Sequence, residues 1–428
     1  MNIIKYPDQK DLPEILKRPV FETDFLESTV KNIINRVQTG GDLTLLEFNE
    51  KFDKAKLETL RVSEEEVKEA STLISDKLKA AIETAAANVR RFHEGQRRSE
   101  QPIETSVGVN CWRKSVAIEK VGIYIPGGTA PLFSTVLMLG IPAAIAGSKE
   151  IVLCTPPGAD GKVAPAILFT AELVGVSKIF KVGGAQAVAA MAYGTESIPK
   201  VDKIFGPGNQ YVTAAKQMVS MDGVAIDMPA GPSELAVIAD NSCDPEFVAS
   251  DLLSQAEHGK DSQVVLISPN EEVINAIIKA VAAQVEDLPR KEIAYESLEH
   301  SKFILVKDID EAMNISNAYA PEHLILATED AVQLAEKVIN AGSVFIGNYS
   351  PESAGDYASG TNHTLPTNGA ARAYSGVSLD SFMKQITFQQ VSEEGIKNLG
   401  PAIEAMAEAE LLQAHKNAVT LRLKKLGV

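Results

Sequence analysis

Four of the six histidines in this sequence have an amide or a carboxylate side chain nearby along the chain. The pairs are Gln255 and His258, Glu322 and His323, Asp356 and His363, and Glu410 and His415. Gln255 and His258 are three residues apart in "SQAEHG", so on a helix both side chains would share one face. Zinc typically takes imidazole nitrogen and carboxylate oxygen in a four-coordinate shell. Gln255, His258, Asp356 and His415 could supply such a shell.

The composition of that ligand set favours a metal site that accepts a substrate. One carboxylate and three neutral ligands would leave zinc with residual positive charge, whereas a closed structural site would normally use thiolates. By themselves, Gln255 and His258 would be interpreted as the polar surface of a helix, because an isolated Gln-x-x-His is far more often that than a ligand pair. His93 in "RRFHEGQ" and His300 in "LEHSKF" lack such neighbours, and we expect both to be solvated surface groups.

Two further stretches carry polar side chains in unusual settings. Glu322 and His323 are adjacent, so on a strand their side chains would face opposite ways, but on a turn after Pro321 both could point into one cleft. The segment "SAGDYASGTNHTLPT", residues 353–367, is polar, contains glycine and has no helix or strand period. A loop of this kind within an ordered chain is more often functional than featureless.

The elements that must position these residues read as alternating strands and helices. From about residue 116, short apolar segments alternate with helical patterns: "VGIYIP", "EIVLCTPP", "KIFKVGG", "KVDKIFGPGN", "GVAIDMP", "ELAVIAD", "QVVLIS", "FILV" and "GSVFIGN". Near-continuous apolar strands separated by helices indicate parallel sheet of the doubly wound α/β kind. The first ~115 residues read mainly as helix, with a capping box at Ser63 and Glu66.

Gly and Pro cluster in "DMPAGPSE", residues 227–234, which we interpret as the junction of two α/β units. The apolar stretch 131–146 contains Pro142 and fits a buried helix. Residues 381–428 read as an amphipathic helical tail. This tail is too small to fold alone, so it should dock on something, for which another subunit is a candidate.

Four glycine-containing turns follow predicted strands: "IPGGTAP", "VGGAQA", "FGPGN" and "PAGPSE". Glycine lets a backbone approach a phosphate closely, and the N-terminus of the following helix favours negative charge. The full G-x-G-x-x-G pattern and the P-loop are both absent from the sequence. The turns alone therefore leave a nucleotide, another anion or plain turns open.

Composition excludes several classes of partner. A formal net charge of -16 argues against binding to nucleic acid or to an anionic membrane surface. No apolar run approaches the ~18 residues of a membrane span. The cysteines, Cys111, Cys154 and Cys243, form neither a disulfide framework nor a zinc-finger spacing, which favours a cytoplasmic setting. None has a histidine nearby in sequence, so we expect none to be catalytic.

On composition and periodicity, two classes of enzyme are nearly equally supported. One is a zinc- and NAD-dependent oxidoreductase that converts an alcohol to an acid. The other is a zinc hydrolase in which Glu322 activates water and the glycine turns bind phosphate. A non-catalytic metal-binding or interaction protein is a weaker third class.

A series of motifs in order separates these classes. The motifs are "GIYIPGGTAPLFSTVLM", "VGGAQAVAAMAYGT", "FGPGNQYV", "DMPAGPSE", "LLSQAEHG", "YAPEHL", "SAGDYASGTNHTLPT" and "AEAELLQAHKNAV". Along essentially the whole chain, the sequence resembles the histidinol dehydrogenase family. The resemblance implies a zinc- and NAD-dependent oxidation of L-histidinol through L-histidinaldehyde to L-histidine, the last step of histidine biosynthesis.

The resemblance also implies a role for individual residues. The zinc ligands would be Gln255, His258, Asp356 and His415, with His415 coming from the partner subunit of an intertwined homodimer. The NAD contacts would be Tyr124, Gln186 and Asn209. Glu322 and His323 would be the acid–base pair. The substrate would meet the four zinc ligands together with Ser233, His323, His363 and Glu410.

The fold implied by the resemblance comprises two doubly wound, incomplete Rossmann-like domains with small N- and C-terminal helical extensions. Residues 1–22 would form the N-terminal extension, and residues 124–232 the NAD-binding domain. Residues 23–123 and 233–380 would form the zinc and substrate domain. Residues 381–428 would be the helical tail that docks on the partner subunit.

Overall fold

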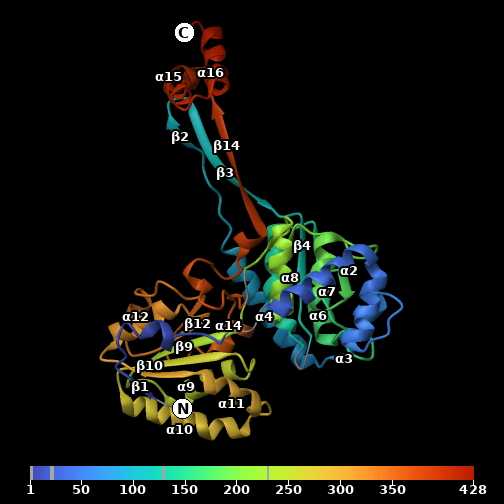
Figure 1. The fold of residues 1–428 in the computed structure, drawn as a ribbon, viewed down its shortest axis with the longest axis vertical. Helices are drawn as coiled ribbons and strands as arrows, with labels where there is room; N and C mark the ends of the chain where they lie inside the picture. Colours follow the sequence, from blue (N-terminus) through green and yellow to red (C-terminus); the bar gives the residue numbers. More distant parts are fainter. Residues whose placement is uncertain (1–2, 20–23, 128–130, 229–230) are drawn as a thin grey trace.

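The computed structural model describes residues 3–19, 24–127, 131–228 and 231–428, which form two parallel β-sheets and a projecting arm (Figure 1). The six-stranded sheet has the order β1 (Ile3–Lys5), β11 (Lys302–Leu305), β10 (Gln263–Ser268), β9 (Glu234–Ala239), β12 (His323–Ala327) and β13 (Ser343–Ile346). The five-stranded sheet has the order β6 (Lys178–Lys181), β5 (Glu150–Thr155), β4 (Lys120–Tyr124), β7 (Lys203–Phe205) and β8 (Ala225–Ile226). The predicted α/β architecture with parallel sheets is confirmed.

Both faces of each sheet are buried. Along β4 of the five-stranded sheet, Ile123 packs into one apolar cluster and Tyr124 into another. Val264 and Val265 of β10 divide in the same way between the two clusters of the six-stranded sheet. Since successive strand residues point to opposite faces, each sheet lies between two apolar layers. This double burial is the reason that the strands read as near-continuous apolar segments.

Two sets of helices supply those layers. The set around the six-stranded sheet is α1 (Leu12–Ile15), α9 (Pro245–Ala256), α10 (Glu271–Gln284), α11 (Lys291–His300), α12 (Ile309–Tyr319), α13 (Ala331–Ala335) and α14 (Glu352–Tyr357). The set around the five-stranded sheet is α2 (Asp24–Phe48), α3 (Glu64–Leu73), α4 (Asp76–Glu94), α5 (Phe133–Ala146), α6 (Pro165–Leu173), α7 (Gly184–Tyr193) and α8 (Gln210–Met221). Short π and 3₁₀ turns are η1 (Asn49–Asp53), η2 (Val285–Asp287), η3 (Ala370–Arg372) and η4 (Leu379–Phe382).

The packing of α2, α3 and α4 differs from the expectation that residues 23–123 belong with the zinc and substrate domain. α2 packs on α7 and α8, α3 packs on α6, and α4 packs on α5, all of which cover the five-stranded sheet. An apolar stripe identifies a helix as amphipathic but does not identify the sheet that will cover the stripe. The change of sheet does fall in the predicted junction 227–234, of which residues 229–230 lie outside the described ranges.

The C-terminal residues form an arm that projects from the two sheets (Figure 1). β14 (Met383–Val391) pairs antiparallel with β3 (Val109–Ala117), which also pairs with β2 (Ile103–Ser106). α15 (Glu393–Ala409) and α16 (Gln413–Lys425) lie at the far end of the arm. The expectation of a wholly helical tail is therefore wrong for residues 383–391. The pairing partner of this strand lies far away in the sequence, where local periodicity does not reveal it.

Two local predictions are confirmed. Ser63 and Glu66 form a capping box at the start of α3, and α5 is buried along most of its length despite Pro142. Within the described ranges, no helix has the length and apolar character needed to cross a membrane.

Candidate active site

Acidic and imidazole side chains gather at the amino ends of two neighbouring strands of the six-stranded sheet. His323 is the first residue of β12, and Glu234 is the first residue of β9. Glu322 precedes β12, and its Oε2 accepts a hydrogen bond of 3.0 Å from the Glu234 N–H. The same carboxylate oxygen lies 3.7 Å from His323 Nδ1. Because Glu322 stands just before the strand, it and His323 can face one buried region.

His323 is enclosed by carboxylates and is only 3% exposed. Its Nδ1 lies 3.6 Å from Glu352 Oε1 and 3.3 Å from the carbonyl oxygen of Glu234. Its Nε2 lies 3.7 Å from Asp356 Oδ1 and has no hydrogen-bond partner among the described residues. The imidazole is thus held on one side and left with an unpaired nitrogen on the other.

A candidate metal centre adjoins this imidazole. Glu352 and Asp356 lie one turn apart on α14, and ligand atoms of His258, Glu352 and Asp356 all lie within 4.8 Å of one another. Gln255 is fully buried at the end of α9, and neither atom of its side-chain amide has a hydrogen-bond partner in the described parts of the chain. A buried amide is rarely left unpaired, so this one suits a ligand. α9 ends at Ala256, so His258 follows the helix.

The electrostatics of the cluster reflect an excess of buried carboxylates. Burial raises the pKa of Glu322 to about 7 and that of Glu352 to about 8. Burial alone would lower the pKa of His323, but the facing carboxylates Glu352, Glu322 and Asp356 outweigh it and raise the pKa to about 10. Desolvation also lowers the pKa of His258, although part of this side chain remains exposed to solvent. A bound cation would offset this negative charge, because an ion is usually the largest local charge in its site.

His363 is half-buried and connects this cluster to the other sheet. Its Nδ1 lies 2.8 Å from the carbonyl oxygen of Asp356, and its Nε2 lies 3.1 Å from the hydroxyl of Thr135 in the first turn of α5. The adjacent Asn362 donates to the Met138 carbonyl at 2.6 Å. Asn362 also approaches the Nε2 of His93 at 3.4 Å.

The expectation of a solvated His93 is wrong, because this residue is fully buried at the last turn of α4. The Nδ1 of His93 lies 2.8 Å from the carbonyl oxygen of Val89, one turn earlier in the same helix. His300 is exposed, as expected.

The candidate NAD residues all line one cavity of about 1060 Å³ beside the five-stranded sheet. Tyr124 ends β4, and its hydroxyl accepts a 3.0 Å hydrogen bond from the Gly184 N–H, while burial raises its pKa to about 12. Gln186 follows in α7 and is buried. Asn209 caps α8, with its Oδ1 accepting from the N–H groups of Tyr211 and Val212.

The backbone of the "FGPGN" turn approaches β4 closely. At Gly206, whose φ is +128°, an added Cβ would lie 2.1 Å from the Tyr124 carbonyl oxygen. Only glycine fits this position, so the turn that carries Asn209 is fixed against the end of β4.

Three other expected site residues lie in different settings. Ser233 is half-buried immediately before β9, and its carbonyl oxygen accepts a 3.3 Å hydrogen bond from the Gln263 N–H. Glu410 and His415 are exposed on the arm, far from the other candidates of the same chain (Figure 1). The single chain therefore brings together His258 and Asp356, with Gln255 three residues before His258, but not His415.

Sequence reasoning missed two carboxylates of the cluster. Glu352 precedes Asp356 by four residues, a spacing that places both on one helix face, and this signal is readable in "PESAGD". Glu234 precedes the apolar strand "LAVIA", but its backbone contact with Glu322 depends on pairing between β9 and β12, which no local pattern reveals.

The fold and the site together define an α/β enzyme that has a buried cluster of carboxylates and His323, with a candidate metal centre, and a cavity of about 1060 Å³ beside the five-stranded sheet. The chain belongs to the histidinol dehydrogenase family, whose model matches residues 16–423. It is therefore an oxidoreductase of histidine biosynthesis.

Relatives match along the full length. The chain is 63% identical to the histidinol dehydrogenase of Bacteroides thetaiotaomicron over 426 residues, covering 100% of both proteins. It is 52% identical to that of Vibrio parahaemolyticus, with 96% of this chain and 95% of the relative covered. The crystal structure of histidinol dehydrogenase from Elizabethkingia anophelis is 55% identical, with a TM-score of 0.98 and coverage of 100% of this chain and 99% of the other.

Proposed function

We propose that this enzyme oxidises L-histidinol to L-histidine through L-histidinaldehyde, with bound zinc and two molecules of NAD used in succession. The observation that carries the proposal is the fully buried amide of Gln255, which finds no hydrogen-bond partner among the described residues and lies three residues before His258 of the metal-site cluster. In a member of this family, that arrangement fits a metal that binds substrate next to an acid–base pair. Glu322 and His323 are that pair.

The residues present fit zinc. Imidazole nitrogen and carboxylate oxygen are ordinary zinc ligands, and the Gln255 amide is buried with both polar atoms free to turn toward an ion. We assign Gln255, His258, Asp356 and the partner subunit's His415 as the ligands. When bound, zinc would hold the substrate by its imidazole and amino nitrogens and so fix the carbinol carbon in place. Glu352 is a further carboxylate within reach of the same ion.

The two protein groups of the acid–base pair divide the proton transfers. A bound cation would offset the carboxylates that raise the pKa of His323 and so leave the imidazole neutral. His323 would then accept the hydroxyl proton through its Nε2, which has no partner among the described residues, as the carbinol carbon gives up a hydride to NAD. The aldehyde must be hydrated before a second hydride can leave, and Glu322 activates that water. His323, once it has released the first proton, accepts the second hydroxyl proton. Ser233, His363 and Glu410 contact the substrate and keep it oriented.

We assign the cavity at Tyr124, Gln186 and Asn209 to NAD. Tyr124 is the last residue of β4, and Gln186 and Asn209 follow β6 and β7, so all three lie at the carboxyl ends where α/β sheets bind ligands. The unit built on this sheet would thus bind NAD, and the unit built on the six-stranded sheet would bind zinc and substrate. The three free cysteines suit a reducing cytoplasm.

We further propose an intertwined homodimer in which the arm of each chain completes the site of the other. Glu410 and His415 lie far from their own chain's cluster, and large apolar side chains beside them are uncovered, with Leu411 89% exposed and Leu412 42% exposed. Such exposed apolar groups at an arm tip are typical of an interface.

The proposal is tested by mixing purified protein with histidinol and NAD while following NADH. We expect about two NADH for each histidinol consumed, and zinc bound near one equivalent per chain by metal analysis. Consumption of histidinol without NADH would contradict the proposal and favour a zinc hydrolase in which Glu322 activates water.

A further inference from the structure

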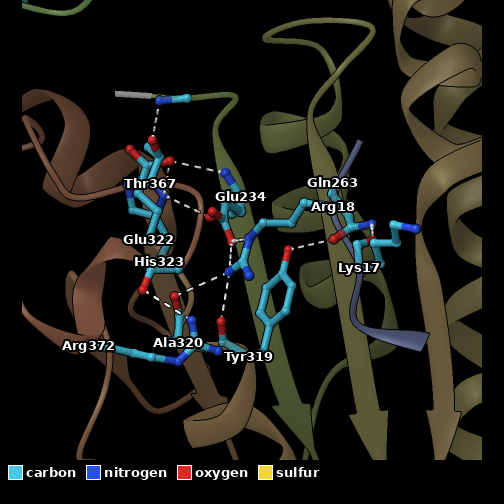
Figure 2. A network of polar contacts seen from close by, with 12 residues as sticks. Lys17, Arg18, Glu234, Gln263, Tyr319, Ala320, Glu322, His323, Thr367 and Arg372 are labelled. Atoms are coloured by element: carbon cyan, nitrogen blue, oxygen red, sulfur yellow. Dashed lines mark hydrogen bonds and ion pairs between the residues drawn. The ribbon is translucent and has the colours of Figure 1, made fainter. Parts of the chain in front are cut away.

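Arg18 joins two segments that lie beside Glu322 and His323 (Figure 2). Its Nε donates a 2.8 Å hydrogen bond to Glu234 Oε2, and its Nη2 binds the same oxygen. Nη2 also donates to the carbonyl oxygens of Tyr319 at 2.7 Å and Ala320 at 3.3 Å. The guanidinium stacks 4.1 Å from the ring centroid of Tyr319. One planar group thus ties the start of β9 to the end of α12.

The start of β9 and the end of α12 both adjoin the proposed reacting groups, Glu322 and His323. The N–H of Glu234 binds Glu322 Oε2 at 3.0 Å, and its carbonyl oxygen lies 3.3 Å from His323 Nδ1. Ala320 precedes Glu322 by two residues and has a left-handed backbone, with φ of +55°. Such a conformation persists in a non-glycine residue only when its surroundings hold it in place. Arg18 binds the carbonyl of this residue.

The ion pair between Arg18 and Glu234 is shielded from water. The Glu234 side chain is 2% exposed and that of Arg18 is 15% exposed. Arginine presents several donors in a rigid fork, and a lysine in its place could not reach the carboxylate and both carbonyls at once. The contacts described for Arg18 do not include Gln255, His258 or Asp356.

We propose that Arg18 is a positioning residue that fixes Glu322 and His323 for proton transfer through the backbone groups of Glu234 and Ala320. The inference rests on the proposed roles of Glu322 and His323. Its consequence is that losing Arg18 slows turnover while leaving substrate affinity and metal binding nearly unchanged. A misplacement of about 1 Å in a reacting group can cost on the order of 100-fold in rate.

The test compares Arg18→Met and Arg18→Lys with Arg36→Met in the full-length protein. Arg36 on α2 is the matched control, since it binds Glu47 at 2.6 Å and stacks 4.6 Å from the Phe48 ring. Arg36 is not among the residues that line the cavity assigned to NAD, and none of its described contacts is with Glu234, Glu322 or His323. For both Arg18 variants we expect kcat to fall about 10–100-fold, KM for histidinol and NAD to change less than about twofold, and zinc content to stay constant. Arg36→Met should match the wild type.

A second variant separates positioning from folding. Arg18→Met leaves a buried carboxylate unpaired, so Arg18→Met with Glu234→Gln removes that charge while still lacking the guanidinium. We expect this double variant to keep the wild-type melting temperature within a few degrees and still to lose kcat. Added guanidinium ion should restore part of the kcat of Arg18→Met, whereas ammonium should not.

The inference would be overturned by an unchanged kcat in a folded double variant, or by a loss that appears in zinc content or KM instead. The wild-type assay is run in parallel and decides the proposed function separately. A wild type that fails to form NADH from histidinol contradicts that function. A normal wild type with normal Arg18 variants contradicts only the positioning role.

Discussion

Pairing two inactive chains should restore activity if the arm completes the partner's site. Glu322→Gln removes a group of the six-stranded unit, and His415→Asn removes a group at the arm tip (Figure 1). In a mixed dimer, the site of the His415→Asn chain keeps its own Glu322 and receives an intact His415 from its partner. The other site of that dimer lacks both groups. Each mixed dimer therefore contains one intact site.

The expected recovery follows from this count. Random pairing of equal amounts makes about half of all dimers mixed, and half of their sites are intact, so total activity should be about one quarter of wild type. Mixed dimers isolated by two different tags should have about one half. Each parent alone should be about 10²–10⁴-fold below wild type, as expected for loss of a general base or of the metal site. The assay is NADH formation from histidinol after co-expression.

A second pair serves as the control. Glu322→Gln with His258→Asn places both changes in the same unit, so neither site of the mixed dimer is intact and no activity should return. If isolated Glu322→Gln and His415→Asn dimers were no more active than their parents, each chain would be using its own His415. Full zinc content in His415→Asn would remove His415 from the ligand set.

Three further outcomes follow from the site and its supports. Glu322→Gln should slow oxidation of supplied histidinaldehyde by at least ~10²-fold and oxidation of the alcohol much less, and equal slowing in single-turnover NADH assays would contradict its assignment to hydration. Lys216→Met should lower the free energy of unfolding, measured with urea, by about 3–5 kcal/mol, because Lys216 and Asp227 form an ion pair whose side chains are 3% and 1% exposed. Adding Asp227→Asn should recover most of that free energy, because it removes the unpaired buried charge. Replacing all three cysteines with alanine should still give two NADH per histidinol, since burial raises the pKa of the Cys154 thiol far above its ordinary value and that of Cys243 to about 11. Selective loss of the second oxidation would instead show that a cysteine thiol takes part in that step.

Local pattern was sufficient for most elements of the two sheets and failed where pairing is distant. β-branched apolar runs identified nine strands, including "EIVLC" and "QVVLIS", because a strand buried on both faces needs apolar residues throughout. β12 was missed because "YAPEHL" reads as a turn, and the apolar residues after it were not separated from that turn. β14 was missed because Phe388 pairs with Trp112, far earlier in the chain.

The candidate site shows the same limit. Gln255, His258 and Asp356 could be singled out because ligand side chains with short spacings are visible in sequence. The spacing of four residues between Glu352 and Asp356 would also have identified Glu352 as a candidate on the same helix face. Arg18 could not be found, since it lies 216 residues from Glu234 and its role exists only once β9 and α12 are packed together.

The arrangement of the two sheets explains why one of them departs from the usual rule for ligand sites. Open α/β sheets bind ligands at the carboxyl ends of their strands, and the proposed NAD contact Tyr124 would obey this rule, since it ends β4. Glu234 and His323 instead begin their strands, and the Glu234 N–H at the start of β9 donates to the Glu322 carboxylate. The 3.1 Å contact between His363 and Thr135, in the first turn of the helix after β4, shows that these two edges meet. In the proposed reaction, a substrate held at the amino edge of the six-stranded sheet would face NAD held at the carboxyl edge of the five-stranded sheet, and the proposed proton acceptors Glu322 and His323 lie at that amino edge.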